Sequence, residues 1–324
     1  MRSDLWRDSS VFLLSVGLGF AACASHSSAG PSAPPGQRER SGTALPGLPP
    51  KAPMNLEQAR RYVLALVNRD RAEHGLGPVV MDEAASRAGQ RHAEDMAQVG
   101  FTAHWGSDGS VPEQRYSEAG GSDFVQENAG CIADGKARKL EVAPRFEAAE
   151  LERVERAFMD EKPPHDGHRR NILKPTHTGF GVGVAKPSGV PIACLSQEFV
   201  DDYGDYAALP KTAHAGDVVS VSGEVKGPVT FGGVGIGRID AQQPLAAAYL
   251  NTTYSYAVPK PSDLYFPKGF VTKKPVEVNG KHFRIEVPLG KRGQAGRYEV
   301  SIWAKFPGAG QQLEMVSLRV IDVR

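Results

Sequence analysis

The sequence has no excess of charge of either sign. Its 324 residues contain 38 Lys and Arg against 37 Asp and Glu, so its net charge does not favour nucleic acid or an anionic partner. The basic residues are scattered, without the interleaved basic and aromatic positions of nucleic-acid-binding proteins. We therefore expect no nucleic-acid partner.

The N-terminal apolar run is too short for a membrane-spanning helix. Val11–Ala22 covers about a dozen residues, whereas a spanning helix needs about 20. The run follows Arg2 and Arg7 and ends in small residues, which is typical of an export signal. We expect residues 1–24 to be a signal peptide.

The end of this run resembles the lipobox of bacterial lipoproteins, in which a cysteine becomes the acylated N-terminus. The four residues FAAC end at Cys23 but carry Phe20 where such boxes usually have Leu. Ordinary cleavage after Ala24 also fits the pattern of small residues. The Ser-, Gly- and Pro-rich residues 25–53 are expected to form a disordered linker. The sequence thus predicts either a lipoprotein of the outer membrane or cell envelope, attached by its lipid, or an extracellular protein.

Cysteine is scarce. Apart from Cys23 the chain has only Cys131 and Cys194, an even pair in an oxidising compartment. A disulfide between them would close a long loop and stabilise the fold by about 3–4 kcal/mol. The alternative is two free, buried thiols.

Helical and strand patterns predict an α+β or three-layer α/β/α domain over residues 54–207. Four helices are expected to begin near Asn55, Asp82, Ser110 and Phe146, from their capping residues and apolar spacing. Two strands joined by a turn are then expected at Gly179–Ala185 and Val190–Val200.

Residues 210–324 change to short apolar or alternating runs separated by Gly, Pro and Asn, with no expected helix. We expect strands at Val218–Val225, Pro228–Ile236, Leu245–Tyr256, His282–Val287, Tyr298–Phe306 and Leu313–Val323. About seven short strands predict an all-β sandwich of immunoglobulin-like type. The glycines of 232–237 are expected in a turn or bulge, because no helix follows to make a phosphate site.

Several polar residues of the first domain could do chemistry, although each has a structural explanation when taken alone. His104 could cap a helix end, Glu127 could serve a turn, and Glu161 could be a solvated charge. The pair His165 and His168 lies among Pro and Gly residues and lacks a third ligand at a fixed spacing, so it is a weak zinc motif.

Two other histidines have structural expectations. His92 lies on the apolar stripe of the second predicted helix, so we expect it in the core and bonded to a neighbour. His177 is expected at the surface, and His165 in a loop.

Five segments, in order, resemble the CAP superfamily of cysteine-rich secretory proteins, antigen 5 and pathogenesis-related proteins, in its bacterial branch. They are VLALVNRDRAEHGLGPVVMDEAASRAGQRHAEDM, GFTAHWGSDGS, QENAG, GHRRNIL and TGFGVGVA. The resemblance covers roughly residues 56–206 and implies a three-layer α-β-α sandwich, the CAP or SCP domain.

The resemblance also implies a cleft with two histidines and two acids, which in the family sometimes holds a divalent metal. By position these are His104, His168, Glu127 and Glu161. The chain departs from the family motif at Gln126, where Gly is usual, and in a longer loop before His168.

Such a tetrad allows two kinds of function. Two imidazoles of the cleft, His104 and His168, could bind Zn²⁺ or another divalent cation, with a carboxylate as general base for hydrolysis. Alternatively the four groups could form a hydrogen-bonded network. We expect a non-catalytic binding module for a lipid-like or small-molecule ligand rather than an enzyme. The alternatives are a metal-dependent, protease-like hydrolase that uses the tetrad, and a sandwich that binds a protein or glycan.

Overall fold

The structure, a computed structural model, describes residues 50, 52–239, 243–253, 255–290 and 294–324. The predicted signal peptide, Cys23 and most of the predicted linker lie outside the described residues. Among those described, no helix combines the length and the apolar character that crossing a membrane requires.

Four helices of the N-terminal unit, residues 54–203, begin within two residues of the predicted positions, and a fifth, α5, was not predicted. They are α1 Leu56–Glu73, α2 Glu83–Val99, α3 Pro112–Glu118, α4 Ala148–Met159 and α5 Gly167–Ile172. The Asn55 side chain accepts a hydrogen bond from the Gln58 backbone and caps α1, and Asp82 caps α2 in the same way. Gly100 ends α2 in the left-handed conformation, with φ 79°.

A mixed sheet forms the middle of this unit. Its strands are β1 Val80–Met81, β2 Phe124–Gly130, β3 Gly179–Ala185 and β4 Cys194–Asp201, in the order β1-β3-β4-β2. The predicted hairpin is confirmed, because β3 and β4 pair antiparallel. Strand β2 is at an edge of the sheet.

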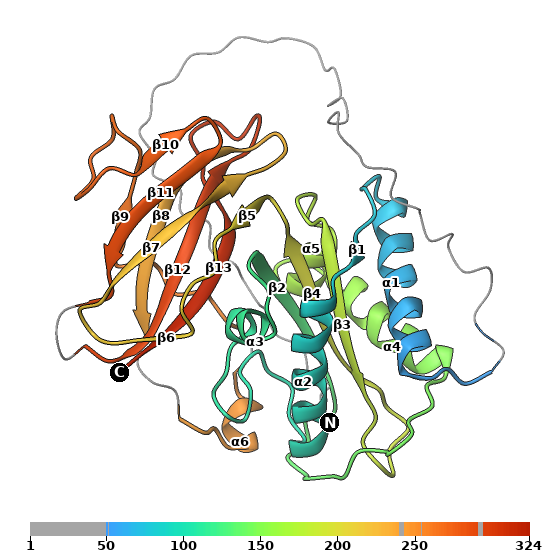
Figure 1. The fold of residues 1–324 in the computed structure, drawn as a ribbon. Helices are drawn as coiled ribbons and strands as arrows, with labels where there is room; N and C mark the ends of the chain where they lie inside the picture. Colours follow the sequence, from blue (N-terminus) through green and yellow to red (C-terminus); the bar gives the residue numbers. More distant parts are fainter. Residues whose placement is uncertain (1–49, 51, 240–242, 254, 291–293) are drawn as a thin grey trace.

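Strand β3 explains how closely the layers pack. Every second residue of GFGVGVA packs against α1 and α4 in one apolar cluster, whereas Gly181 and Gly183 face α2. A Cβ atom on Gly183 would lie 2.1 Å from the backbone of Gly89 in α2. The helix therefore rests directly on the strand backbone, and the sheet lies between α2 and the α1–α4 pair (Figure 1).

The C-terminal unit, residues 204–324, contains two sheets that share one apolar core. Its elements are β5 Gly204–Tyr206, β6 Thr212–Ala213, β7 Val218–Val225, β8 Thr230–Ile239, α6 Ala247–Leu250, β9 Asp263–Tyr265, β10 Glu277–Asn279, β11 His282–Pro288, β12 Gly296–Lys305 and β13 Glu314–Val323. The sheets have the orders β10-β11-β7-β5 and β6-β13-β12-β8-β9. Phe231 and Phe283 stack between them, with ring centroids 4.4 Å apart.

Two expectations for this part of the chain need correction, and a third is confirmed. Residues 204–206, assigned to the first domain, pair with β7 in the second unit. The predicted strand Leu245–Tyr256 is instead the short helix α6 with irregular flanks, because its apolar side chains pack on the other unit. The bulge expected among residues 232–237 is present in strand β8: Gly233 pairs with Trp303 and Phe231 with Ala304, so Gly232 is the extra residue of the strand.

The two units are in direct contact through β13, α3 and the end preceding β2. The Leu318 backbone N–H donates to the Asp123 carbonyl at 3.3 Å, and the Ser317 hydroxyl donates to the Ser122 carbonyl at 2.5 Å. The Val320 N–H lies 3.4 Å from the Ser117 hydroxyl. These hydrogen bonds join α3 and the segment before β2 to strand β13 of the C-terminal unit.

Candidate functional site

The disulfide Cys131–Cys194 is present, as predicted. Cys131 follows the end of β2 and Cys194 begins β4, so the bond fastens two neighbouring strands at one end. Neither sulfur is available as a nucleophile, since both are used in the bond.

His104 and Glu127, distant in sequence, form a buried pair. Nδ1 of His104 lies 2.9 Å from Oε1 of Glu127, and the Glu127 side chain is fully buried. His104 comes from the loop after α2, and Glu127 from edge strand β2. The carboxylate thereby holds the imidazole in one orientation.

Arg115 of α3 neutralises this buried carboxylate. Its guanidinium donates to Glu127 Oε2 at 2.7 Å and to the His104 carbonyl at 3.0 Å, and Ser196 Oγ lies 3.0 Å from Glu127 Oε2. Burial opposes ionisation of Glu127, but the charge of Arg115 and the bond from His104 hold its pKa well below the usual range. Glu127 is therefore ionised and fully engaged.

Two further buried groups adjoin Glu127 and stay neutral. Glu198 is its direct partner across the β2–β4 ladder, and burial together with the Glu127 charge raises the pKa of Glu198 well above its ordinary value. Burial, assisted by the charge of Arg115, lowers the pKa of His92 to about 4. His92 bonds the Ala103 carbonyl at 2.7 Å, as expected for a core histidine.

His168 and Glu161 form a second, more accessible pair. Nδ1 of His168 lies 2.5 Å from Glu161 Oε1, and the side chains are 13% and 10% exposed. Glu161 also accepts the backbone N–H of His168 at 2.9 Å, and the imidazole packs on Phe158, with centroids 4.6 Å apart. Glu161 thus orients the His168 ring and accepts a backbone N–H from the first turn of α5.

The two pairs lie on different sides of edge strand β2. Successive side chains of a strand point to opposite faces, and Glu127 contacts residues of the α2 side. Its neighbour Asn128 instead donates to the His168 carbonyl at 3.2 Å and accepts from Asn171 of α5 at 3.0 Å. The tetrad is therefore two His–carboxylate pairs linked through β2.

This arrangement does not match a resident metal centre. Within the described part of the chain, no group of three or more His, Cys, Asp or Glu side chains is placed to hold a metal ion. Structural and catalytic zinc ions take three or four protein ligands. His104 and His168 as metal ligands remain a prediction.

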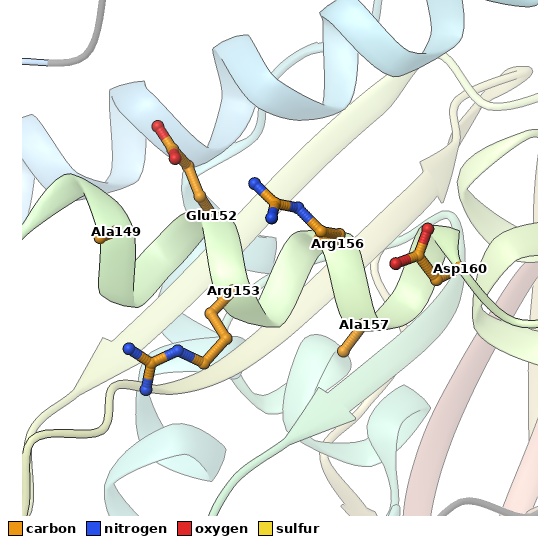
Figure 2. A pocket seen from close by; sticks show the side chains of 6 residues that line it. All are labelled: Ala149, Glu152, Arg153, Arg156, Ala157 and Asp160. Atoms are coloured by element: carbon orange, nitrogen blue, oxygen red, sulfur yellow. The ribbon is translucent and has the colours of Figure 1, made fainter.

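A hollow of about 310 Å³ reaches His92 and Arg115, which both adjoin Glu127. Its other lining residues come from α2 and the loop after His104: Arg91, Glu94, Asp95, Gln98, Ser107, Asp108 and Ser110. A second hollow, of about 450 Å³, follows the outer surface of α4 (Figure 2). The second hollow includes none of the four predicted site residues.

The C-terminal unit contacts the loop that carries His104. Residues 245–253 with Tyr256, here called the strap, pass over this loop. Asn251 accepts from the Thr102 N–H at 3.1 Å and donates to the Gly100 carbonyl at 3.2 Å. Beyond His104, the Leu245 N–H donates to the Ser107 carbonyl at 2.8 Å.

Aromatic and apolar contacts reinforce the strap. The rings of Tyr256 and Trp105 meet edge to face, 5.0 Å apart, and the Tyr256 hydroxyl donates to Glu113. Leu250 is fully buried in a cluster with Met96 and Phe101. The strap therefore brackets His104 on both sides along the chain.

Of the other histidines, His177 was wrongly expected at the surface. It is buried, with Nδ1 2.8 Å from Asp201 Oδ1 and Nε2 3.0 Å from Asn171 Oδ1, and burial lowers its pKa. His165 lies exposed in the loop before α5, as expected.

Sequence reasoning missed Arg115, Ser196 and Glu198. The segment SQE inside the buried strand β4 was a usable signal, because three consecutive polar residues in a buried strand require partners. No comparable signal marked Arg115, whose contact with Glu127 depends on how α3 packs.

Comparison with known proteins identifies a family for part of the chain. Residues 64–194 match the model of the CAP family, described as the cysteine-rich secretory protein family. These residues form a CAP domain. The curated protein YkwD of Bacillus subtilis, itself uncharacterized, is 27% identical over 150 residues, which are 46% of this chain and 49% of YkwD. The chain thus spans about half the length of this relative.

Two solved structures are each similar to 45% of this chain. One is an extracellular protein containing an SCP domain from Bacillus anthracis, with TM-score 0.35 and 18% identity, covering 45% of this chain and 41% of that one. The other is an outer surface protein of Borrelia burgdorferi, with TM-score 0.35 and 15% identity, covering 45% of this chain and 95% of that one. Because both TM-scores are low, the family assignment rests on the sequence match.

Proposed function

We propose that this protein is an exported binding module, and that its CAP domain holds a ligand at the two His–carboxylate pairs without converting it. The observation that carries the proposal is the state of Glu127. A general base must take a proton from a ligand within hydrogen-bond reach, but Glu127 is buried, ionised and engaged by His104, Arg115 and Ser196. It is better suited to holding His104 than to moving protons.

Export is supported by the predicted signal peptide and by the disulfide, because disulfides persist in oxidising compartments. The relatives described as extracellular or outer-surface proteins agree with it. We propose that acylated Cys23 anchors the chain to the envelope, and mass spectrometry of the mature N-terminus tests this. An unmodified mature chain beginning after Ala24 would contradict the anchor.

The ligand is proposed to be a small molecule or a lipid-like molecule. Extraction of the purified protein followed by mass spectrometry should identify a bound compound that is lost in His168→Ala and retained in His165→Ala. His165 is a matched control, because it lies exposed in the adjoining loop. Equal retention of the compound in both variants would place binding elsewhere.

The competing function is metal-dependent hydrolysis, and metal content separates it from ligand binding. Elemental analysis of the wild type, His104→Ala and His168→Ala tests the metal site predicted at these two histidines, and the absence of stoichiometric metal from the wild type would exclude the hydrolase. A screen of peptides and esters should show no turnover. Metal at one equivalent together with turnover abolished by Glu161→Gln, a change at a partly exposed position, would overturn the binding proposal.

A further inference from the structure

Exposed apolar side chains gather on one edge of the C-terminal unit. Of the large apolar side chains that are exposed in the described residues, half lie within the short segment from β9 to β10. They are Leu264, Phe270, Val271 and Val278. Phe270 is 65% exposed and Val271 is 99% exposed, so two of the most exposed side chains are sequence neighbours.

This segment occupies an open position in the fold. Strands β9 and β10 are each the last strand of their sheet, and the loop between them is closed at its base by a bridge between Pro267 and Val276. In Figure 1 the segment lies on the side of the C-terminal unit turned away from α1 and α2. It is therefore remote from the contact between the two units.

The loop is held by its own hydrogen bonds, which leave the tip exposed. The Val276 N–H donates to the Phe266 carbonyl at 2.9 Å. Thr272 Oγ1 accepts from the Phe266 N–H at 3.2 Å and donates to the Lys274 carbonyl at 3.0 Å. Val276 itself is buried in the core, so the base is anchored while Phe270 projects.

Basic residues outnumber acidic ones around the tip. Residues 264–278 contain Lys268, Lys273 and Lys274 and one acidic residue, Glu277, although the whole chain has nearly equal numbers of both signs. All three lysines are exposed. Lys273 reaches back to Asp263 at the segment's border. The apolar tip is therefore surrounded by cations.

We propose that the edge formed by residues 264–278 docks on an anionic lipid bilayer. Phe270 and Val271 enter the boundary between headgroups and acyl chains, where aromatic and aliphatic side chains are favoured. The lysines keep their ammonium groups among the headgroups while their stems lie along the apolar region, and anionic lipids attract them. An aliphatic side chain at the tip suits hydrocarbon better than a polar glycan. This docking depends neither on the CAP-domain ligand nor on acylation of Cys23.

The test is sedimentation of the full chain with lipid vesicles. The protein carries Cys23→Ser, which cannot be acylated, and the vesicles contain phosphatidylcholine alone or phosphatidylcholine with phosphatidylglycerol. We expect binding to the anionic vesicles that weakens with added salt. The double variant Phe270→Ser/Val271→Ser should bind about tenfold more weakly, as expected when two apolar side chains no longer leave water.

Matched variants separate the parts of the proposal. Val142→Ser alters an equally exposed valine in the CAP domain and should bind as the wild type does. Lys268→Gln/Lys274→Gln should reduce binding to anionic vesicles and leave binding to neutral ones unchanged. Because these side chains are exposed, each variant should have the melting temperature of the wild type. Equal melting temperatures would show that a loss of binding is not due to misfolding.

Three results would overturn the proposal. They are absence of vesicle binding, equal binding to neutral and anionic vesicles, and binding that the Phe270→Ser/Val271→Ser variant retains in full. Retention of the wild type on insoluble cell-wall glycan without vesicle binding would identify the edge as a glycan-binding surface instead.

Discussion

Glu127 illustrates what a single buried charge requires of its surroundings. An ionised carboxylate is stable inside a protein only when partners replace its water, and here His104, Arg115 and Ser196 do so. The resemblance of the QENAG and GFTAH segments to the CAP family predicted Glu127 and His104. Arg115 was not predicted, because an arginine on a short helix is usually a surface residue.

At this scale we predict that Arg115→Met destabilises the protein by about 3–5 kcal/mol, because it leaves Glu127 charged, buried and without its cation. The control is Arg91→Met, since Arg91 pairs with Asp108 and Glu118 at a partly exposed position. That change should cost about 1 kcal/mol or less. Urea unfolding measures both variants. Similarly small losses of stability in both variants would show that Arg115 is not needed to neutralise Glu127.

Strand β3 shows how an element's sequence sets the distance between layers. The alternation in GFGVGVA predicted a strand, and it also separates an apolar face from a glycine face. Only the packing shows that the glycine face receives α2. The same local reasoning failed for residues 245–256, whose apolar residues suit a strand but dock on the CAP domain as the strap.

We predict that Gly183→Ala destabilises the fold by about 1–3 kcal/mol or more, because its methyl group would overlap the backbone of Gly89 and force α2 away from the sheet. Gly77→Ala is the control, since a Cβ atom there would have no neighbour within 4 Å. Its effect should stay within about 0.5 kcal/mol. Thermal unfolding compares the two, and equal midpoints would contradict direct contact between α2 and β3.

At the scale of the whole molecule, acidic groups are buried where the two units meet. Glu113 of α3 and Glu299 of β12 are both buried, and Tyr256 of the strap donates to Glu113. Burial and the nearby Glu113 charge raise the pKa of Glu299 to about 8, although Arg297 opposes the shift. Burial and the charges of Asp202 and Asp82 raise the pKa of Asp123 to about 8, with Lys226 opposing.

The pH dependence of the contact follows from these shifts. A carboxyl group with a raised pKa in the folded state binds its proton there while the unfolded chain has already released it. The contribution of Glu299 therefore favours folding most below its ordinary value of 4.5. It is lost progressively as the pH rises to about 8.

We predict that at pH 9 the free energy of unfolding of Glu299→Gln exceeds that of the wild type by an amount on the order of a few kcal/mol. The two proteins should differ less at pH 4, where the wild-type carboxyl is neutral in both states. Melting temperatures across this range provide the measurement, with Glu277→Gln, an exposed site on β10, as control. Parallel pH profiles for wild type and Glu299→Gln would contradict a neutral Glu299 in the folded protein.

The sequence by itself determined the features that depend on neighbouring residues. Capping side chains at Asn55 and Asp82, the alternation of β3 and the order of the CAP motifs are readable locally, and only two cysteines remain to pair once Cys23 is set aside. Tertiary structure decided the contact of Arg115 with Glu127, the neutral partner Glu198 and the course of the strap. These features join residues far apart in the chain. The apolar periodicity of a segment does not show which surface of the protein the segment will pack on. The physical reason is that burial and charge pairing depend on the assembled layers, which no short stretch of sequence contains.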